Sequence, residues 1–514
     1  MAKGDSLLFM KSRTDWLLFA AILIVVIAGA IGFEYTDGGG QKPAFSAAPL
    51  DDSWIHFVYA RAFATTLRFD YNPGQAEAGF SSMLWVILLA PFLLIHINPP
   101  LAAKILGLAA HIATAFLMYR WLRNIAPEAA AICAALMVAV DPVFTQAALS
   151  GMEVMPYALC MTAATALFFE SRYKACALFL GLVALARPDG MIFVGILWFV
   201  FAIEALASRS PYHTDRRITG NDVLWVFLIP IAAVLLWVAY CLAATGRPVP
   251  NSYYVRAGGA SFFYNLDSLD RILRDVSRTS FYLSAWWKAP LLLAPVYLLV
   301  KRMRKGILLL LFPPVFLALM GGEQIQIVGG NFLGNRYLIP VMPFVIALQV
   351  FNVSLIAVGI GWLARKWKHR DVLTAMVIVM LCTVYFFPPG SWWQRRQEME
   401  RDFAVGSANI EQMQVRIGKW IDENTAPDAK VAVFDAGAIR YLGNRGTLDI
   451  LGLNNAGFVA EDPVTLKREA DYLVTYPDLT PKLAEAFAGR EVFRVHLQEN
   501  IASAGDTMVV YKVR

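Results

Sequence analysis

The stretch LDDSWIHFVYARAFATTLRFDYNPGQAEAGFSSMLW, residues 50–85, decides how this chain is interpreted. It places two adjacent carboxylates, Asp51 and Asp52, and a run of polar residues soon after the first strongly apolar segment, residues 16–33. A chain that buries apolar segments in a membrane keeps such polar residues only where they line protein or water. The role of the stretch therefore depends on the side of the membrane on which it lies.

The composition is that of a polytopic membrane protein. Of the 514 residues, 58% are hydrophobic and 16% are charged, and the mean hydropathy is +0.52. Soluble domains carry about 25% charged residues. All five cysteines lie in apolar runs, which predicts small buried side chains rather than a disulfide framework or a zinc site; they are Cys133, Cys160, Cys176, Cys241 and Cys382.

About eleven membrane crossings account for the apolar segments and the basic clusters together. Segment 16–33 is too long for a signal-peptide core and no small-residue cleavage site follows it, so we expect an uncleaved first span that starts in the cytoplasm. Further spans are expected near 101–119, 128–140, 155–171, 175–187, 190–207, 223–243, 290–300, 306–320, 339–363 and 371–388. The basic clusters at 120–123, 172–174, 209–217, 301–305 and 365–370 then all face the cytoplasm. Segment 85–97 would invert this scheme if it crossed, so we expect a re-entrant or membrane-surface helix there.

The same scheme gathers the polar loops on the outer face. They are residues 51–82 within a first external loop at 34–84, and residues 141–153, 187–190, 250–288 and 321–336. Their convergence predicts a site at the outer membrane boundary. We expect residues 1–388 to form the membrane domain. Residues 389–514 are more charged and contain the strand-like runs VAVFDAG, DYLVTY, VFRVHL and TMVVYKV, which predicts a small soluble α/β domain on the same face.

Asp51 and Asp52 precede SWIHFVYARAFATT, which is expected to form a helix near the membrane surface. In a structural reading, an aspartate here caps the helix and favours its positive end. In a chemical reading, a carboxylate beside a bound sugar accepts a hydroxyl proton in the transition state, or holds a metal ion. Adjacent residues on a helix point in different directions. One aspartate can therefore cap while the other faces a cleft.

Six motifs follow one another along the chain in the order of a known family. They are DD…YAR…NPG…GFSSMLW at 51–85, SGME at 150–153, ARPDG at 186–190, PNSYY at 250–254, GGNFLGNRY at 329–337 and LDILGL at 448–453. The first resembles the signature DDAYI…RYA…NPGE…EGYTSPLW of a group of GT-C-type membrane glycosyltransferases. That group includes the mycobacterial terminal β-1,2-arabinofuranosyltransferases of cell-wall polysaccharide assembly.

The resemblance implies a GT-C fold, a mainly α-helical membrane bundle with its site in the first external loop, and a polyprenyl-phosphate sugar as donor. It implies that Asp51 or Asp52 is the catalytic carboxylate, or the metal-binding one if a divalent metal takes part. Positions within its motifs that become candidates for binding substrate are Arg61, Asn72, Glu77, Ser81, Asn251 and Asn331. Two departures bear on the sugar rather than on the reaction class: the family's Glu before Gly-Tyr is Ala78 here, with Glu77 one place earlier, and its Gly-Gly-Asp is Gly-Gly-Asn331.

Three arginines are candidates for binding the donor phosphate. Arg256 and Arg336 are the stronger two, because guanidinium forks match phosphate oxygens and neighbouring glycines let backbone amides approach. Arginines on the outer face also extend to lipid head groups. Arg187 can bind phosphate, or it can pair locally with Asp189, for which a structural role is expected.

Other candidates have similar alternatives. Glu153 lies at the mouth of a predicted span, where a charge is costly unless it lines a polar cavity. Tyr254 and Trp85 can contact the substrate or belong to the interfacial aromatic belt. His56, His96 and His111 have no metal-ligand spacing, and a structural role is expected for each.

The leading hypothesis is a glycosyltransferase of the bacterial cytoplasmic membrane, active on the extracytoplasmic side. It transfers a sugar, arabinofuranose by the resemblance, from a polyprenyl phosphate to an envelope glycan, lipid or protein. Neither G-x-G-x-x-G nor a Walker loop occurs, which fits a lipid-linked donor, and no nucleic-acid partner is expected. The alternatives are a lipid-linked sugar transporter or flippase, which predicts charges at mid-membrane depth and inverted repeats, and a non-catalytic assembly scaffold.

Overall fold

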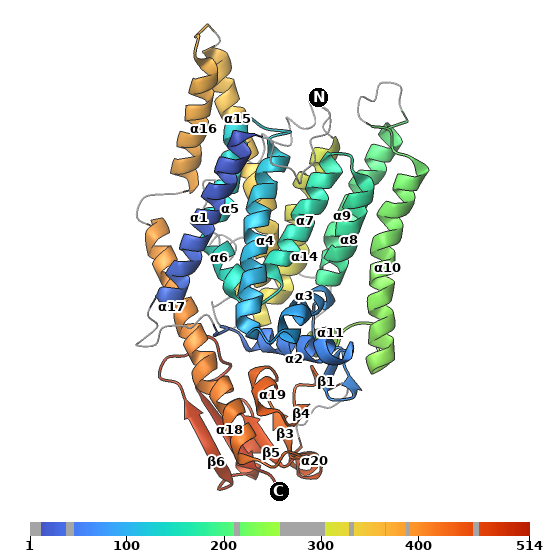
Figure 1. Cartoon of the computed structure of the whole chain (residues 1–514), viewed down its shortest axis with the longest axis vertical. Helices are drawn as coiled ribbons and strands as arrows, with labels where there is room; N and C mark the ends of the chain where they lie inside the picture. The colour runs from blue at the N-terminus through green and yellow to red at the C-terminus, as the bar shows by residue number, and fades with distance from the viewer. Residues whose placement is uncertain are drawn as a thin grey trace.

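The computed structural model describes residues 12–36, 46–209, 216–257, 304–327, 334–364, 366–386, 391–455 and 462–514. Figure 1 shows a bundle of helices with a small domain of helices and strands at one end. Helix α2 runs across that end of the bundle, between the long helices and the small domain (Figure 1). The predicted fold class, mainly α-helical with a small C-terminal α/β domain, is confirmed.

The described residues of the membrane part mostly form helices. Their bounds are α1 Arg13–Tyr35, α2 Asp51–Thr66, α3 Met83–Leu94, α4 Pro99–Leu122, α5 Glu128–Val140, α6 Pro142–Leu149, α7 Val154–Phe169, α8 Tyr173–Ala186, α9 Gly190–Ala207, α10 Gly220–Thr245, α11 Asn251–Ala257, η4 Arg304–Gly306, α14 Ile307–Ile327, η5 Gly334–Tyr337, η6 Ile339–Val341, α15 Met342–Leu363 and α16 Arg370–Phe386. A short hairpin, β1 Asp70–Asn72 and β2 Gln75–Ala76, follows α2.

Five helices of the described part are long and apolar enough to cross a membrane, or six if the bent pair α5 and α6 is one span. They are α1, α4, α9, α10 and the segment Ile339–Leu363, while α3, α7 and α8 are apolar but shorter. The protein is therefore a multi-pass membrane protein. The span expected at 290–300 lies outside the described residues, and the count of eleven crossings stays a prediction.

Helix α3 falls within the segment expected to lie on the membrane surface. Its 12 residues rise about 18 Å, well short of a hydrocarbon core of about 30 Å. By its length, α3 does not cross a membrane unaided.

Several of the basic clusters meet at the end of the bundle that lies away from the small domain. Arg216 donates to the Ser171 carbonyl at 2.9 Å, and Lys305 donates to the Ser171 hydroxyl at 2.7 Å. Arg120 and Arg123 both bind the carboxylate of Asp15, near the start of α1. This common location is what the positive-inside argument requires; the side of the membrane on which it lies stays a prediction.

The C-terminal domain is a mixed five-stranded sheet in the order β4-β3-β5-β7-β6. Strands β3 and β4 are parallel, as are β3 and β5, whereas β7 is antiparallel to both β5 and β6. The bounds are α17 Ser391–Ile410, η7 Glu411–Val415, α18 Arg416–Asn424, β3 Lys430–Val433, α19 Ala438–Gly443, β4 Gly446–Asp449, α20 Pro463–Glu469, β5 Tyr472–Thr475, α21 Pro481–Ala486, β6 Glu491–His496 and β7 Thr507–Lys512. Helix α17 contacts α1 and α6 in the bundle and continues into the domain (Figure 1).

Candidate active site

The two aspartates that open α2 point to different partners. The carboxylate of Asp51 accepts the backbone amides of Gly437 and Ala438, both at 2.8 Å, where the turn after β3 enters α19. Asp52 instead forms an ion pair with Arg336 of η5. The expectation that one aspartate caps α2 is wrong, because the N-cap of α2 is Leu50 and no side chain caps it. Asp51 instead binds the start of α19, a helix of the C-terminal domain.

A third carboxylate, Asp435, lies close to this pair. It accepts the Tyr476 hydroxyl at 2.5 Å and the Gln414 amide at 2.7 Å. Burial raises the pKa of Asp51 well above its ordinary value and the negative charge of Asp435 adds to this rise, while the two backbone amides oppose it. Gln414 stands in the π-helical turn η7, an irregularity that is frequent at functional sites.

The ion pair of Asp52 and Arg336 lies partly open to solvent. The Asp52 side chain is 43% exposed and that of Arg336 is 11% exposed. Arg336 also donates to the Tyr337 hydroxyl at 3.3 Å, and its guanidinium lies 5.2 Å from the centre of the Tyr337 ring. Its Nε–H is buried and has no acceptor among the described residues, so one donor of the fork is left for a further oxygen.

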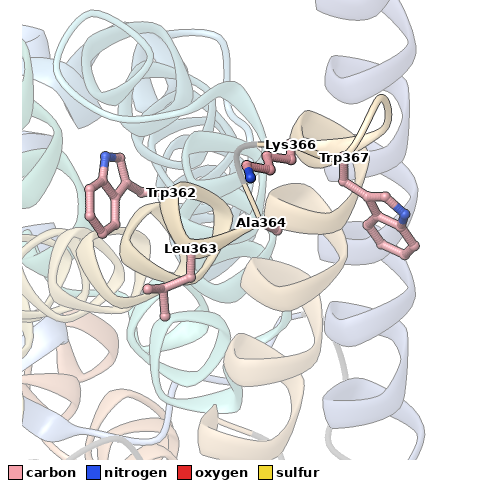
Figure 2. Close-up of a pocket in the computed structure, with 5 residues that line it drawn as sticks. All are labelled: Trp362, Leu363, Ala364, Lys366 and Trp367. Carbon is pink, nitrogen blue, oxygen red and sulfur yellow. The ribbon is translucent and has the colours of Figure 1, made fainter.

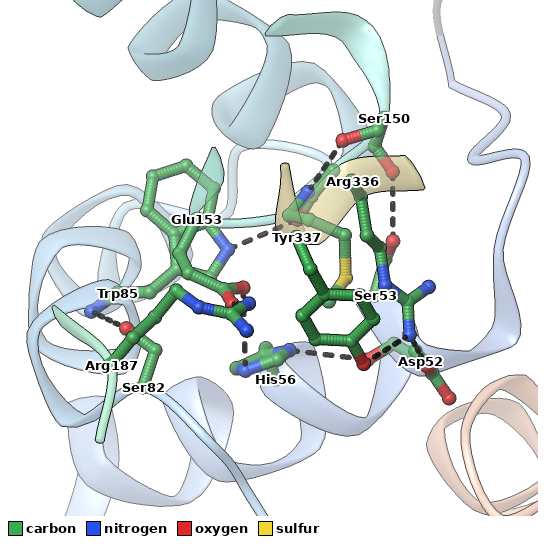
Figure 3. Close-up of polar contacts among 12 residues, drawn as sticks. Asp52, Ser53, His56, Ser82, Trp85, Ser150, Glu153, Arg187, Arg336 and Tyr337 are labelled. Atoms are coloured by element: carbon green, nitrogen blue, oxygen red, sulfur yellow. Dashed lines mark hydrogen bonds and ion pairs between the residues drawn. The ribbon is translucent and has the colours of Figure 1, made fainter. Parts of the chain in front are cut away.

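Across Tyr337 from this pair, Glu153 and Arg187 form a buried ion pair at 2.7 Å (Figure 3). Arg187 also binds Asp189 at 2.8 Å and lies 4.5 Å from the centre of the Tyr337 ring. Arg187 therefore already serves two carboxylates. The local pairing with Asp189 that the sequence suggests is present, and the isolated charge of Glu153 is compensated.

His56, for which the sequence predicts a structural role, lies between the two groups of charges. Its Nδ1 lies 3.1 Å from the Asp52 carbonyl, so Nδ1 carries the proton, and its Nε2 lies 3.9 Å from a Glu153 carboxylate oxygen. Burial lowers the pKa of His56, and Glu153 opposes this. Figure 3 shows Asp52, His56, Glu153 and Arg336 around Tyr337. Asp52 and His56 are four residues apart, about one helical turn. This spacing is the signal in the sequence that could have indicated their proximity.

The SGME motif forms the support under α2. The Ser53 hydroxyl donates to the Ser150 carbonyl at 2.8 Å, and the Trp85 indole donates to the Gly151 carbonyl at 3.0 Å. Gly151 has a φ of +82°, and a Cβ there would lie 2.9 Å from the Ser53 side chain. Trp85 is itself buried, so its indole serves packing here rather than an open surface.

Three predicted substrate-binding residues connect the first external loop and α11 to the C-terminal domain; we call these contacts the loop–domain interface. Their role in binding substrate stays a prediction. Asn72 exchanges two hydrogen bonds with the backbone of Thr447, both at 2.9 Å. Arg61 donates to the Tyr441 carbonyl at 2.9 Å and lies 4.0 Å from the centre of its ring. Asn251 donates to the Leu453 carbonyl at 3.2 Å.

The remaining predicted residues are spread around this region. Glu77 accepts the Asn251 amide at 3.1 Å, and Ser81 is half-buried. Tyr254 is partly exposed, with the Arg247 guanidinium 4.7 Å from its ring centre. The side chain of Arg256 and the whole of Asn331 lie outside the described residues.

The aspartates do not offer a ready metal site. Both carboxylate oxygens of Asp51 accept backbone amides, and Asp52 contacts a guanidinium. Within the described residues, no three His, Cys, Asp or Glu side chains are placed to hold a metal ion together. We derive no step through a metal, and the predicted divalent ion at Asp51 or Asp52 stays a prediction.

A shallow pocket at the turn between α15 and α16 is far from this region. It is lined by Trp362, Leu363, Ala364, Lys366 and Trp367 (Figure 2), and both tryptophans are strongly exposed. The turn lies at the opposite end of the bundle from α2 (Figure 1). Exposed tryptophans beside a basic residue are typical of a membrane–water interface.

Comparison with known proteins supports the fold. Residues 408–511 match a family described as "Domain of unknown function (DUF8728)". No curated protein matches the chain. The structure is similar to ArnT from Cupriavidus metallidurans in the apo state, with 14% identity, a TM-score of 0.57, and 98% of this chain and 99% of that chain covered.

Two further solved structures give the same result. ArnT from the same organism bound to undecaprenyl phosphate is 12% identical, with a TM-score of 0.55 and coverage of 98% and 99% of the two chains. The oligosaccharyltransferase AglB from Archaeoglobus fulgidus, in complex with an inhibitory peptide and a dolichol-phosphate, is 12% identical, with a TM-score of 0.53 and coverage of 90% and 70%. The chain therefore has the GT-C fold. At these identities the similarity carries the fold alone.

Proposed function

We propose that this protein is a membrane glycosyltransferase that transfers a sugar from a polyprenyl-phosphate donor to an acceptor on the extracytoplasmic face. The observation that carries the proposal is the partly exposed ion pair of Asp52 and Arg336 in a GT-C fold, at the end of the bundle that meets the C-terminal domain. The similar structures include one bound to undecaprenyl phosphate and one in complex with a dolichol-phosphate. A lipid-linked donor is the corresponding substrate here.

In the proposed reaction, an acceptor hydroxyl oxygen attacks the anomeric carbon of the donor sugar. The bond from that carbon to the phosphate oxygen breaks, and polyprenyl phosphate leaves with the electron pair. Asp52 accepts the hydroxyl proton as the new glycosidic bond forms. Arg336 stabilises the charge that develops on the leaving phosphate, to which its Nε–H can donate.

The finer assignment of the donor rests on the sequence motifs. The series from the first external loop to LDILGL resembles the arabinofuranosyltransferase group, so arabinofuranose is the sugar we propose to test first, with an envelope glycan as acceptor. Ala78 and Asn331 depart from that series, and other pentoses and hexoses therefore belong in the same test.

The test uses purified full-length protein and a panel of radiolabelled polyprenyl-phosphate sugars with a mixture of envelope acceptors. Release of polyprenyl phosphate and label transfer are measured for the native protein, for Asp52→Asn, and for Asp478→Asn as a control at an exposed position of the C-terminal domain. We expect turnover with one donor that falls by about 10³-fold or more in Asp52→Asn and is unchanged in Asp478→Asn. Undiminished transfer by Asp52→Asn contradicts the assigned base, and no turnover with any donor contradicts the enzymatic function.

A further inference from the structure

We propose that the C-terminal domain is a working part of the active site, because it holds Asp51 and thereby positions Asp52. In this proposal Asp51 is a positioning residue and Asp52 is the residue that meets the substrate. The proposal rests on the proposed function and assigns a role to the segment that matches a domain of unknown function, residues 408–511.

The contact between Asp51 and the domain is close and uses both oxygens of the carboxylate. Gly437 donates to Oδ2 and Ala438 donates to Oδ1, each at 2.8 Å. A Cβ on Gly437 would lie 2.2 Å from the Asp51 carbonyl oxygen and 2.7 Å from its Oδ2. Because such separations are far below van der Waals contact, no side chain fits at this position while the two segments stay docked.

Residues of the β1 strand hold the same turn from a second direction. The Tyr71 hydroxyl donates to the Ala436 carbonyl at 2.7 Å, and Arg440 donates to the Tyr71 carbonyl at 3.0 Å. These groups are buried. Residues 436–440 are therefore fixed relative to the first external loop by four hydrogen bonds that cross between the domains.

Asp52 lies between two fixed points. On the bundle side, the next residue, Ser53, is bound to Ser150, and His56 is hydrogen-bonded to the Asp52 carbonyl. On the other side, the preceding residue, Asp51, is bound to the C-terminal domain. The first turn of α2 is thus held from above and below, and the direction of the Asp52 side chain depends on both attachments.

Charge gives a reason for this arrangement. Asp51 and Asp52 are adjacent in the chain. Beyond the effect of burial, the negative charge of Asp435 raises the pKa of Asp51, and that of Asp52 raises the pKa of Asp435. Negative charges on three neighbouring carboxylates repel one another. The two backbone amides offset part of the negative charge of Asp51, and so reduce its repulsion of Asp52. Displacing a reacting group by about 1 Å can cost on the order of 10²-fold in rate. Loss of the attachment should therefore lower kcat and leave donor binding nearly unchanged.

The experiment compares Asp51→Ala, Gly437→Ala and the double variant in full-length protein in lipid nanodiscs. Gly446→Ala is the matched control, since it lies in the same domain and its Cβ would meet only the Lys430 side chain, at 3.7 Å. Two quantities are measured: amide hydrogen exchange of residues 436–443, and kcat with KM for the donor found above.

We expect faster exchange of 436–443 in both single variants, a fall in kcat of about 10- to 100-fold, and a donor KM within about threefold of the native value. The kcat of the double variant should be no lower than that of the slower single variant, because both changes remove the same contact. Gly446→Ala should behave as the native protein. Asp51→Ala adds no atoms, so it carries the test even where Gly437→Ala fails to fold.

Three results overturn the proposal: unchanged exchange of 436–443 in Asp51→Ala, faster exchange with an unchanged kcat, or losses of kcat that multiply in the double variant. Multiplied losses would mean that Asp51 acts on the reaction independently of the domain. The exchange measurement needs no substrate. A native protein without turnover therefore refutes the proposed function separately, while exchange still decides whether Asp51 holds the domain.

Discussion

The Asp51 carboxylate accepts the Gly437 amide at 2.8 Å, although the two residues are 386 positions apart in the chain. One belongs to the first external loop and the other to the C-terminal domain. The sequence predicts a division between a membrane domain and a soluble domain near residue 388. The contact shows that the candidate active site extends across this division, so variants on either side of it should affect the same reaction.

Replacing Arg336 with alanine should weaken donor binding. Arg336 is the ion-pair partner of Asp52, and its unpartnered Nε–H is the proposed donor to the leaving phosphate. We expect KM for the polyprenyl-phosphate sugar to rise about tenfold or more and kcat to fall as well, since charge-assisted hydrogen bonds contribute roughly 1.5–3 kcal/mol. Steady-state kinetics with the donor varied checks this. Arg401→Ala is the control, because Arg401 forms an exposed pair with Glu499 and should change neither constant.

Glu153 and Arg187 should matter first for stability. The pair is buried, and Glu153→Ala leaves Arg187 with Asp189 as its remaining carboxylate, so the change should lower the free energy of unfolding by about 1–3 kcal/mol. The triple variant Glu153→Met, Arg187→Met, Asp189→Asn removes all three charges of this cluster and should recover much of this loss. Thermal unfolding in detergent measures both. A single variant as stable as the native protein would instead free Glu153 for a functional role.

Gly79 should tolerate no side chain. A Cβ there would lie 2.1 Å from the Asn454 side-chain oxygen and 2.7 Å from the Leu453 carbonyl, in the network where Tyr59 donates to Asn454 at 3.0 Å. Gly79→Ala should therefore loosen the loop–domain interface at an expected cost of about 1–3 kcal/mol. Gly195→Ala, whose Cβ meets nothing within 4 Å, is the control. Equal thermal unfolding of the two variants would mean that the Asn454 loop adapts at little cost.

The sequence predicts the local structure of this region better than its long-range partners. The helix after Asp51 and Asp52 and the pairing of Arg187 with Asp189 both have signals within a few residues. The sequence has no such signal for the partners of Asn72 and Asp51, because hydrogen bonds to backbone groups more than 350 positions away leave no local pattern.

The same limit explains why the sequence does not indicate Asp435, and why it does not indicate the partner of Asn72 in the C-terminal domain. Asp435 follows a strand in the C-terminal domain and has no motif of its own, so only the docking of that domain brings it near Asp51. Asn72 was proposed as a substrate-binding residue from its motif. In the structure it exchanges two hydrogen bonds with the Thr447 backbone, and its role in binding substrate stays a prediction.

The raised pKa of Asp449 lets us predict how the stability of the protein depends on pH. It is buried in the LDILGL motif, where it accepts backbone amides from Leu451 and Asn454. Burial raises its pKa from 3.8 to about 6, against the effect of these hydrogen bonds. Between these two values the folded protein holds the proton that the unfolded chain has lost. The stabilising contribution is therefore complete below about pH 3.8 and is lost as the pH rises through about 6, by about 3 kcal/mol in all.

Thermal unfolding of full-length protein between pH 4 and pH 7 tests this, with Asp449→Asn compared to the native chain. The variant cannot titrate, so the difference in stability between the two should shift in favour of the variant as the pH rises. Asp51 and Asp435 also have raised pKa values and act in the same direction, but they are present in both proteins and cancel in the difference. Parallel pH profiles would show that Asp449 is ionised in the folded protein throughout this range, and that its hydrogen bonds outweigh its burial.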